Sequence, residues 1–255
     1  MAVPTSAPRP VHTATVVRSH ALAPDMIRVV LTGPGVGALT DLTHTDTYVK
    51  LLFGDAKRAY TIRWLDRDAA QMAIDFVVHG DEGLAGPWAI AAQPDDEISF
   101  VAPSGDWAPR PEADAHLFVG DEAAIPAIAA ALERLAGHDP QARAQVFLEV
   151  ASARHEQPMP QTARTELTWV HRDQHEGSYG PGLVRAVVGA DFPDGDVEGF
   201  VHGNADMVRP LRRHLLKERG VPREHLSISG YWRAGHTDES WRALKREFNA
   251  AMDAE

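Results

Sequence analysis

The sequence predicts a two-domain β plus α/β protein. We expect a six-stranded antiparallel β-barrel in residues 1–110 and a parallel-sheet α/β domain with a terminal helix in residues 111–255. The first part holds six short segments of alternating apolar and polar residues, separated by Gly and Pro turns. The second part alternates strand-like and helix-like segments. Between the two parts, residues 107–111 contain two prolines in five positions, which suits neither a strand interior nor a helix.

Period-two alternation marks the strands of the expected barrel. The predicted strands cover residues 12–19, 26–32, 48–53, 58–64, 72–79 and 97–101. Ala23-Pro24-Asp25 reads as the turn after the first strand. One helix-like insertion covers residues 84–92. Short strands with a single helical insertion favour a closed antiparallel barrel over an open sheet.

Strands and helices then alternate, as in a parallel sheet with crossover helices. We expect strands at residues 116–120, 145–150, 166–171, 199–202 and 226–231, and helices at 125–136, 182–188 and 205–219. The last segment, residues 237–255, reads as an amphipathic helix. Thr237 is its expected N-cap, Asp238 and Glu239 occupy its first turn, and Trp241, Leu244 and Phe248 share its apolar face.

Composition limits the classes of function. The chain has 255 residues, 44% of them hydrophobic, which is enough for a buried core. A net charge of -11 argues against a nucleic-acid partner, because phosphate binding needs a basic face. The absence of cysteine excludes disulfides, thiolate metal sites and iron–sulfur clusters, so any electron transfer must use another group, such as a flavin.

The sequence also bears on localisation. The N-terminus lacks the charged start and apolar core of a signal peptide. The sequence contains no run of about 18 apolar residues, the length that a membrane-spanning helix needs. We therefore expect no membrane insertion and a cytoplasmic location.

The segment from Arg58 to Gly80 carries the first chemical signal. Arg58, Tyr60 and Thr61 fall within four residues of one predicted strand. A bound isoalloxazine needs a flat aromatic to stack on, a donor near its N5 and a cation for its phosphates. The same residue types are ordinary in strands, so this segment alone is a weak signal.

Further segments follow in a fixed order. Asp75 and His79-Gly80 end the next strand, and GLAGPWAIAA, APSGDW and GDEAAIPAIAAALERLA come after them. This series resembles the siderophore-interacting proteins, a branch of the ferredoxin reductase-like flavoproteins that reduce ferric chelates. The resemblance covers nearly the whole chain. It implies an FAD-binding barrel, an NAD(P)H-binding α/β domain and a ferric siderophore as substrate.

In the barrel, the resemblance implies that the FAD-contacting residues are Arg58, Tyr60, Thr61, Asp75, Phe76, Val77, Val78, His79, Gly83, Ala85 and Trp88. Asp75 and His79 are expected to share the strand face opposite Phe76, and a solvent-facing polar pair is the rival interpretation of Asp75. Backbone amides at the start of the predicted helix are expected to bind the pyrophosphate. Leu84 stands where the family commonly has Pro.

In the second domain, the resemblance implies nucleotide contacts at the ends of strands. Asp121 and Glu122 are expected near the nicotinamide, with Ala123 where the family has Thr, which removes one hydroxyl from the pocket. Arg154 follows the second parallel strand, where an Arg could accept a 2'-phosphate, and this favours NADPH.

Two later turns complete the expected nucleotide site. The HGNA segment contributes Gly203, with Asn204 where the family has Glu. The GYWRAG segment contributes Trp232 and Arg233, and it matches the family closely. The chain continues past Trp232 into a helix, so Arg233 and that helix are expected to shape the substrate or nucleotide pocket.

Basic residues near these segments are candidates for binding an anionic siderophore. They are Lys50, Lys57, Arg63 and Arg233, and each alone reads equally as a surface charge. His171 and His175 stand four apart in a predicted loop, so we expect no metal held by the protein. No general acid or base is assigned, because the redox chemistry belongs to the cofactor.

The predicted reaction passes electrons from NAD(P)H through FAD to a ferric siderophore and releases ferrous iron. Two alternatives remain open: a flavin reductase or the reductase partner of an oxygenase, and a non-catalytic siderophore-binding protein. The Ala123 and Asn204 departures keep the second alternative open. We expect a monomer, although the sequence does not fix the oligomeric state.

Overall fold

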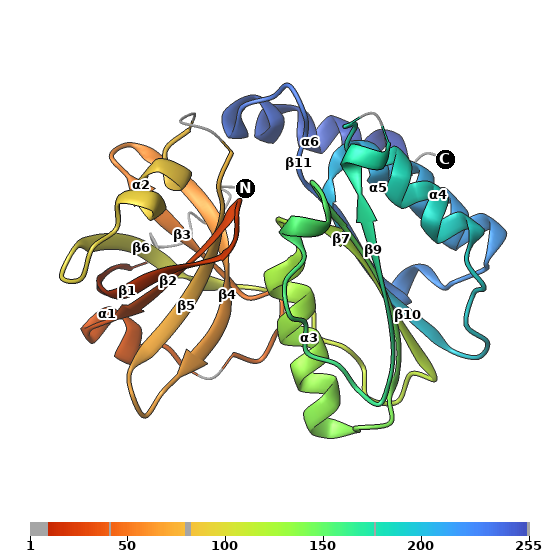
Figure 1. Cartoon of the computed structure of the whole chain (residues 1–255), viewed down its shortest axis with the longest axis horizontal. Helices are drawn as coiled ribbons and strands as arrows, with labels where there is room; N and C mark the ends of the chain where they lie inside the picture. Colours follow the sequence, from red (N-terminus) through yellow and green to blue (C-terminus); the bar gives the residue numbers. More distant parts are fainter. Residues whose placement is uncertain (1–9, 41, 80–82, 176, 254–255) are drawn as a thin grey trace, which may run out of the picture.

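The computed structural model describes residues 10–40, 42–79, 83–175 and 177–253 and places two domains side by side (Figure 1). The N-terminal domain is a closed barrel in the strand order β1-β2-β5-β4-β3-β6. Its strands are β1 (Val11–Ala23), β2 (Met26–Thr32), β3 (Tyr48–Phe53), β4 (Ala56–Asp66), β5 (Gln71–Val77) and β6 (Glu97–Ser104). All neighbouring strands are antiparallel, which confirms the predicted barrel.

The barrel is filled by the inward positions of the alternating strands. Its fully buried side chains include Val29, Leu31, Leu51, Ile74 and Phe100. Two short helices, α1 (Pro34–Gly37) and α2 (Ala85–Ala91), pack against this core. Strand β1 has 13 residues, five more than predicted, and register shifts interrupt its pairing with β2. Such bulges bend a strand, which allows a long strand to follow a closed barrel.

The C-terminal domain is a five-stranded parallel sheet in the order β11-β10-β7-β8-β9. Its strands are β7 (Ala115–Asp121), β8 (Arg143–Val150), β9 (Arg164–His171), β10 (Val197–Asn204) and β11 (Leu226–Trp232). Every residue of β7 and β10 is buried, as expected for central strands covered on both faces. This confirms the predicted parallel-sheet domain.

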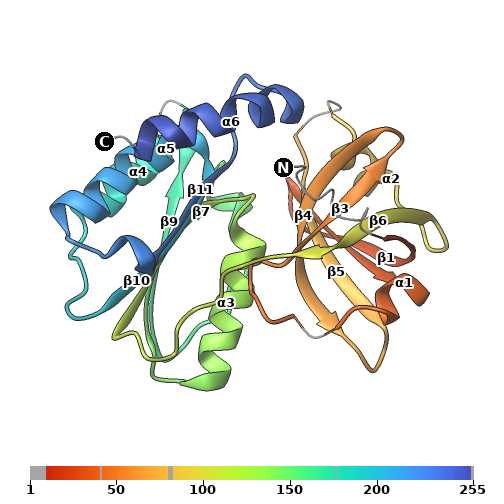
Figure 2. The ribbon, with the colours of Figure 1, turned by 180° about the vertical axis from the view of Figure 1, so that it is seen from behind.

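Helices cover both faces of the sheet. Helix α3 (Ile125–His138) packs on the face toward the barrel, whereas α4 (Pro181–Gly189), α5 (Ala205–Arg213) and α6 (Asp238–Asp253) lie on the other face (Figures 1 and 2). Short 3-10 turns occur at Ala153–His155, Arg172–Gln174 and Arg223–His225. The helix predicted over residues 205–219 is present as α5 followed without a break by a π-helix at His214–Glu218, so only the type of its last turn and its end differ from the prediction.

Helix α6 confirms its predicted cap but not its whole apolar face. The Ser240 amide donates to the Thr237 hydroxyl at 3.2 Å, so Thr237 is the N-cap. Trp241 and Met252 are buried, and Phe248 packs edge-on against Trp241. Leu244 is 40% exposed, because it lies at the edge of the buried stripe rather than at its centre.

The connection at residues 105–114 touches both domains. The Trp107 ring packs against Phe200 at a centroid distance of 4.6 Å and against Phe118 at 6.2 Å. Its carbonyl oxygen accepts a 2.9 Å hydrogen bond from the Thr45 amide, which precedes β3. The segment is therefore held to the sheet by its side chain and to the barrel by its backbone.

Candidate functional site

Arg58 and Tyr60 lie on one face of β4. Tyr60 is paired in register with Val49 and Arg58 with Leu51, and both partners point into the barrel. Thr61 is paired with Tyr48, so its side chain lies on the opposite face. The structure thus brings the expected cation and aromatic ring together, whereas the Thr61 hydroxyl points away from them.

The Tyr60 ring rests on an aromatic cluster at the end of the barrel. Its centroid lies 4.5 Å from that of Phe76, and the Phe76 ring lies 5.5 Å from that of Trp88 on α2. Phe76 is fully buried, so its side chain supports Tyr60 from below. Burial raises the pKa of Tyr60 to about 12, which keeps the phenol neutral at physiological pH.

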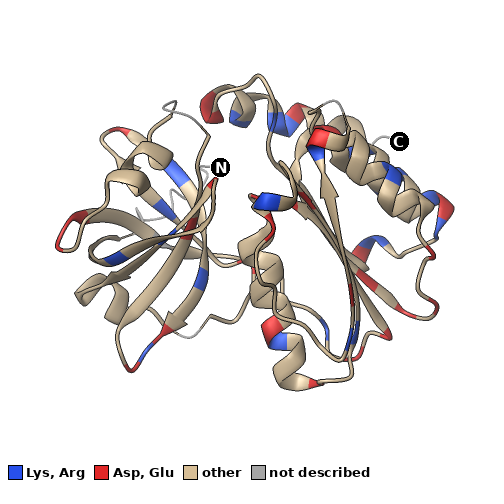
Figure 3. Cartoon of the chain, in the orientation of Figure 1, with Lys and Arg blue, Asp and Glu red and all other residues tan. Residues whose placement is uncertain are grey.

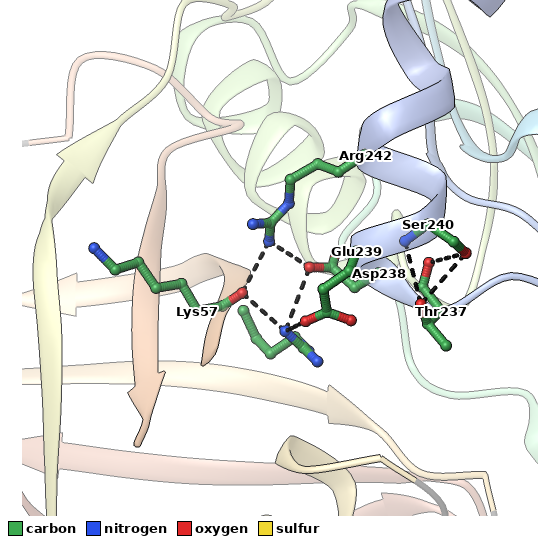
Figure 4. A network of polar contacts seen from close by, with 7 residues as sticks. Lys57, Thr237, Asp238, Glu239, Ser240 and Arg242 are labelled. Atoms are coloured by element: carbon green, nitrogen blue, oxygen red, sulfur yellow. Dashed lines mark hydrogen bonds and ion pairs between the residues drawn. The ribbon is translucent and has the colours of Figure 1, made fainter. Parts of the chain in front are cut away.

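The Arg58 guanidinium reaches the other domain. Its Nη1 binds the Glu239 carboxylate at 2.6 Å and lies 3.5 Å from the Asp238 carboxylate, both in the first turn of α6 (Figure 4). Arg242, one turn further along, ion-pairs with Asp238 and donates to the Lys57 carbonyl oxygen at 2.8 Å. Ion pairs and a hydrogen bond therefore connect the start of α6 to β4, next to the residues expected to bind the flavin.

The end of β5 departs from the prediction. The strand stops at Val77, opposite the first residue of β2, so the half-buried Val78 and the exposed His79 lie beyond it. The Val78 amide still donates to the Asp25 carbonyl oxygen at 2.8 Å, in the register of the β2–β5 pair. Asp75 and His79 consequently do not share a strand face. Asp75 is also not solvent-facing: it is 4% exposed and binds Arg28 through two hydrogen bonds of 2.6 and 2.8 Å.

Helix α2 is shorter than predicted, at seven residues. Ala85 is buried and Trp88 is half-buried, whereas Gly83 is exposed and has a φ of 88°. Leu84 precedes the helix, is 42% exposed and gives no side-chain cap. A helix of this length contributes little dipole, which makes Arg58 the principal candidate for binding phosphates.

Asp121 lies at the meeting point of three strand ends. Its buried carboxylate accepts hydrogen bonds from the Asn204 amide at 2.7 Å, the Trp232 indole Nε1 at 2.8 Å and the Ala123 amide at 3.0 Å. A side chain at Gly203, whose φ is 136°, would come within 2.6 Å of Asp121. Burial, with a smaller contribution from Glu122, raises the pKa of Asp121 to about 7.

The Glu122 carboxylate also forms an ion pair within the domain. It binds Arg172 through two hydrogen bonds of 2.5 and 2.9 Å, and both side chains are nearly buried. The Arg172 guanidinium lies 4.2 Å from the Tyr179 ring centroid, and Tyr179 meets Trp232 edge-on at 4.7 Å. The carboxylates of Asp121 and Glu122 are therefore turned inward onto partners in the chain itself, and their place near the nicotinamide stays a prediction.

The remaining basic residues fall into different environments. Arg154 is exposed in the turn after β8, Lys57 is exposed near the start of β4, and Lys50 is half-buried on the outer face of β3. Arg233 donates to Asp206 at 3.0 Å. Arg63 does not present a free charge to a substrate, because it is 7% exposed and both its Nη atoms bind Glu133 of α3 at 2.7 Å.

Charge is unevenly distributed over the molecule. Acidic positions occur at the start of α6, which faces the barrel, whereas basic positions occur along the barrel strands opposite it (Figure 3). Within residues 10–40, 42–79, 83–175 and 177–253, no group of three His, Asp or Glu side chains is arranged to hold a metal ion. No helix among these residues is both long enough and apolar enough to cross a membrane.

Comparison with known proteins identifies the family. The model described as siderophore-interacting protein matches residues 113–235, and that of the siderophore-interacting FAD-binding domain matches residues 15–58 and 55–107. The crystal structure of a siderophore utilization protein from T. fusca superposes with a TM-score of 0.78 at 32% identity, covering 91% of this chain and 96% of that chain. The chain belongs to the siderophore-interacting protein family.

Three further relatives match this chain over most of their own length. An uncharacterized protein of Mycobacterium tuberculosis is 39% identical over 279 residues, covering 95% of this chain and 97% of that protein. The ferric vibriobactin reductase of Vibrio cholerae is 28% identical over 264 residues, covering 94% of each chain. A ferredoxin-NADP+ reductase of Plasmodium falciparum shares only the fold, with a TM-score of 0.70 at 10% identity, covering 86% of this chain and 95% of that chain.

Sequence reasoning missed the partners of several site residues. It treated Asp238 and Glu239 only as companions of the helix dipole and did not find Arg28, Arg172 or Tyr179. Arg28 faces Asp75 across the β2–β5 pair, so opposite charges at matching strand positions are a signal once the strand order is known. The contacts of Arg172 join segments far apart in the chain and leave no local pattern.

Proposed function

We propose that this protein is an FAD-dependent reductase that passes electrons from NAD(P)H to a ferric siderophore. The observation that carries the proposal is the placement of Arg58 and Tyr60 on one face of β4, over the Phe76 and Trp88 rings. The cation suits phosphates and the supported phenol suits an isoalloxazine face, so the side chains present fit FAD. The related ferric vibriobactin reductase supports the substrate class.

In this proposal each residue has a binding or orienting role. Arg58 binds the flavin phosphates, and Tyr60 stacks on the ring while Phe76 keeps the phenol from tilting into the barrel. The backbone of residues 77–79 would contact the ring of the bound cofactor. FAD, when bound, takes up electrons in pairs from a nicotinamide and can release them singly to ferric iron.

The carboxyl ends of β7, β10 and β11 form the proposed nucleotide side of the site, as in other open α/β sheets. Asp121 fixes Trp232 and the Asn204 turn, and Glu122 fixes Arg172 beneath Tyr179. Arg154 is the proposed contact for a 2'-phosphate. Lys50 and Arg233 are the proposed siderophore contacts. Arg63 is not proposed as a contact, because its guanidinium binds the Glu133 carboxylate.

Iron is the substrate in this scheme and arrives inside its chelator. Hard oxygen chelators hold ferrous iron far more weakly than ferric iron, so a single electron is enough to release the metal. We place the reaction in the cytoplasm and assign it to a monomer. The chain's own contribution is to orient the donor, the flavin and the chelate, and no side chain needs to act as an acid or a base.

The test is an anaerobic titration of purified protein reconstituted with FAD. We expect NADPH or NADH to bleach the flavin absorbance, and a ferric siderophore to restore it while a ferrous trap takes up iron in equal electron stoichiometry. Reoxidation by added free FMN, with no response to the ferric chelate, would instead favour a flavin reductase. A flavin that neither nucleotide bleaches would favour a non-catalytic siderophore-binding protein, and failure to bind FAD at all would overturn the proposal.

Two variants connect this test to the site. Arg58→Gln is expected to weaken FAD binding by about tenfold or more, because a charge-assisted contact to phosphate is lost. Tyr60→Phe is expected to retain FAD, since stacking needs the ring and not the hydroxyl. Tyr60→Leu is expected to lose FAD occupancy, and equal binding by Tyr60→Leu and the wild type would exclude stacking on this residue.

A further inference from the structure

Two carboxylates in the first turn of α6 contact Arg58 of β4, the residue proposed to bind the flavin phosphates. Glu239 binds Arg58 Nη1 at 2.6 Å, and Asp238 lies 3.5 Å from the same atom (Figure 4). Arg242 ties the helix to the Lys57 carbonyl oxygen beside Arg58. Two carboxylates of one chain segment therefore converge on one guanidinium of another domain.

These contacts are accessible to solvent. The exposed side-chain fractions are 20% for Arg58, 32% for Asp238 and 59% for Glu239. An exposed ion pair contributes little to stability, so it can open without leaving a charge stranded in a core. Helix α6 does not depend on it for anchoring, because Trp241 and Met252 are buried against the second domain and Phe248 packs on Trp241.

The chemistry of the two carboxylates matches that of the group Arg58 is proposed to bind. A carboxylate and a phosphate both present paired anionic oxygens, which an Arg guanidinium accepts in the same way. Arg58 Nη1 cannot hold Glu239 at 2.6 Å and a phosphate oxygen at the same position. A phosphate placed there would also lie close to the negative charges of Asp238 and Glu239, which repel it.

We propose that Asp238 and Glu239 form an internal competitor for the flavin phosphates at Arg58, so that binding FAD displaces the start of α6 from β4. The inference rests on the proposed function, because it assumes that Arg58 binds the cofactor. The competitor lowers FAD affinity and couples cofactor occupancy to the contact between the two domains. The acidic first turn thus acts on the cofactor site, in addition to stabilising its own helix.

The test compares the FAD affinity of flavin-free wild type, Glu239→Gln, Arg58→Gln and the double variant, by quenching of flavin fluorescence at low salt. Glu247→Gln is the matched control, because it removes the same charge from an exposed position on the same helix. We expect Glu239→Gln to bind FAD about threefold to tenfold more tightly than wild type, as loss of an exposed competing pair and its repulsion allows. The gain should shrink as salt is raised.

The double variant decides whether the effect acts through Arg58. We expect Glu239→Gln to produce no gain in the Arg58→Gln background, because the competition has no target there. Hydrogen exchange gives a second measurement: amides of residues 238–242 should exchange faster in the wild type when FAD is added, as α6 leaves β4.

Three results would overturn the inference. They are an equal FAD affinity of Glu239→Gln and Glu247→Gln, a gain in affinity that persists without Arg58, and protection of the first turn of α6 from exchange by FAD. Each of these leaves the proposed function intact as long as the wild type binds FAD. If none of the proteins binds FAD, the proposed function falls together with the competitor, and the two failures are thereby distinguished.

Discussion

Trp232 donates its indole N–H to Asp121 across 2.8 Å, and the accepting carboxylate has no exposed surface. The bond links the last residue of β11 to the last residue of β7, although β10 lies between these strands in the sheet. Asp121 also accepts the Asn204 amide at the end of β10. One side chain thus fixes the carboxyl ends of three neighbouring strands, where the nucleotide is proposed to bind.

Replacing Asp121 with Ala should destabilise the protein by about 3–5 kcal/mol, because three buried donors lose their acceptor. Urea denaturation followed by circular dichroism measures the change. Trp232→Phe is the comparison, since it removes one of the three donors and part of the ring that packs on Tyr179, and it should cost about 1–2 kcal/mol. A loss below 1 kcal/mol for Asp121→Ala would show that the three donors find other partners.

The titration of Asp121 predicts a pH dependence of stability. Its pKa in the folded protein is raised to about 7 by burial and by Glu122, whereas the unfolded value is 3.8. Between these values the folded state holds a proton that the unfolded state releases, so this contribution is complete below pH 3.8 and is lost as pH rises through 7. We therefore expect the free energy of unfolding of wild type, relative to Asp121→Asn, to fall from pH 4 to pH 7. A flat difference would contradict the shift.

Arg63 should behave as a structural residue and not as a substrate contact. Arg63→Met should lower the free energy of unfolding by about 1 kcal/mol, because Glu133 is half-exposed and water screens part of the pair. Glu133→Gln should cost a similar amount, and the two losses should not add in the double variant. The Michaelis constant for the ferric siderophore should stay unchanged in Arg63→Met, and a rise of tenfold would return Arg63 to the substrate site.

Gly230 should not tolerate a side chain. A Cβ at this position would lie 2.8 Å from the Ala205 Cβ and 3.1 Å from the Trp241 ring, so Gly230→Ala should cost about 1–3 kcal/mol through overpacking. Gly189→Ala is the matched control, because no atom lies within 4 Å of its added Cβ. Thermal denaturation of the two variants should separate them by several degrees. Equal melting temperatures would mean that α5 and α6 shift freely.

The strand and helix order could be predicted because each element has its own local period. The alternation over residues 48–53 and the long apolar helix from Ile125 give signals that need no partner. Boundaries were less accurate: β5 was predicted through His79, yet it ends at Val77, because its partner β2 begins at Met26 and the Val78 amide bonds Asp25 in the turn before β2. That bond joins residues distant in sequence and is invisible to a periodic pattern.

The candidate site was predictable only in part, for the same physical reason. The R-x-Y-T segment located Arg58 and Tyr60, because strand spacing alone puts them on one face. Asp75, Glu122 and Arg63 were expected to meet ligands, but each is paired with a charge from another element. A charged residue in a sequence reads the same whether it faces a ligand or a buried counter-ion, and only the packing of elements decides.

Trp107 has a further consequence for how the two domains move. Its ring packs on the neighbouring Phe118 and Phe200 of the sheet, while its carbonyl oxygen accepts a hydrogen bond from the Thr45 amide before β3, so a rotation of one domain against the other strains one of these contacts. The connection therefore restrains the two domains relative to each other instead of acting as a flexible hinge. A restrained spacing between the barrel and the sheet edge would hold the proposed flavin and nucleotide sites in place relative to each other, which lowers the entropic cost of bringing their ligands together.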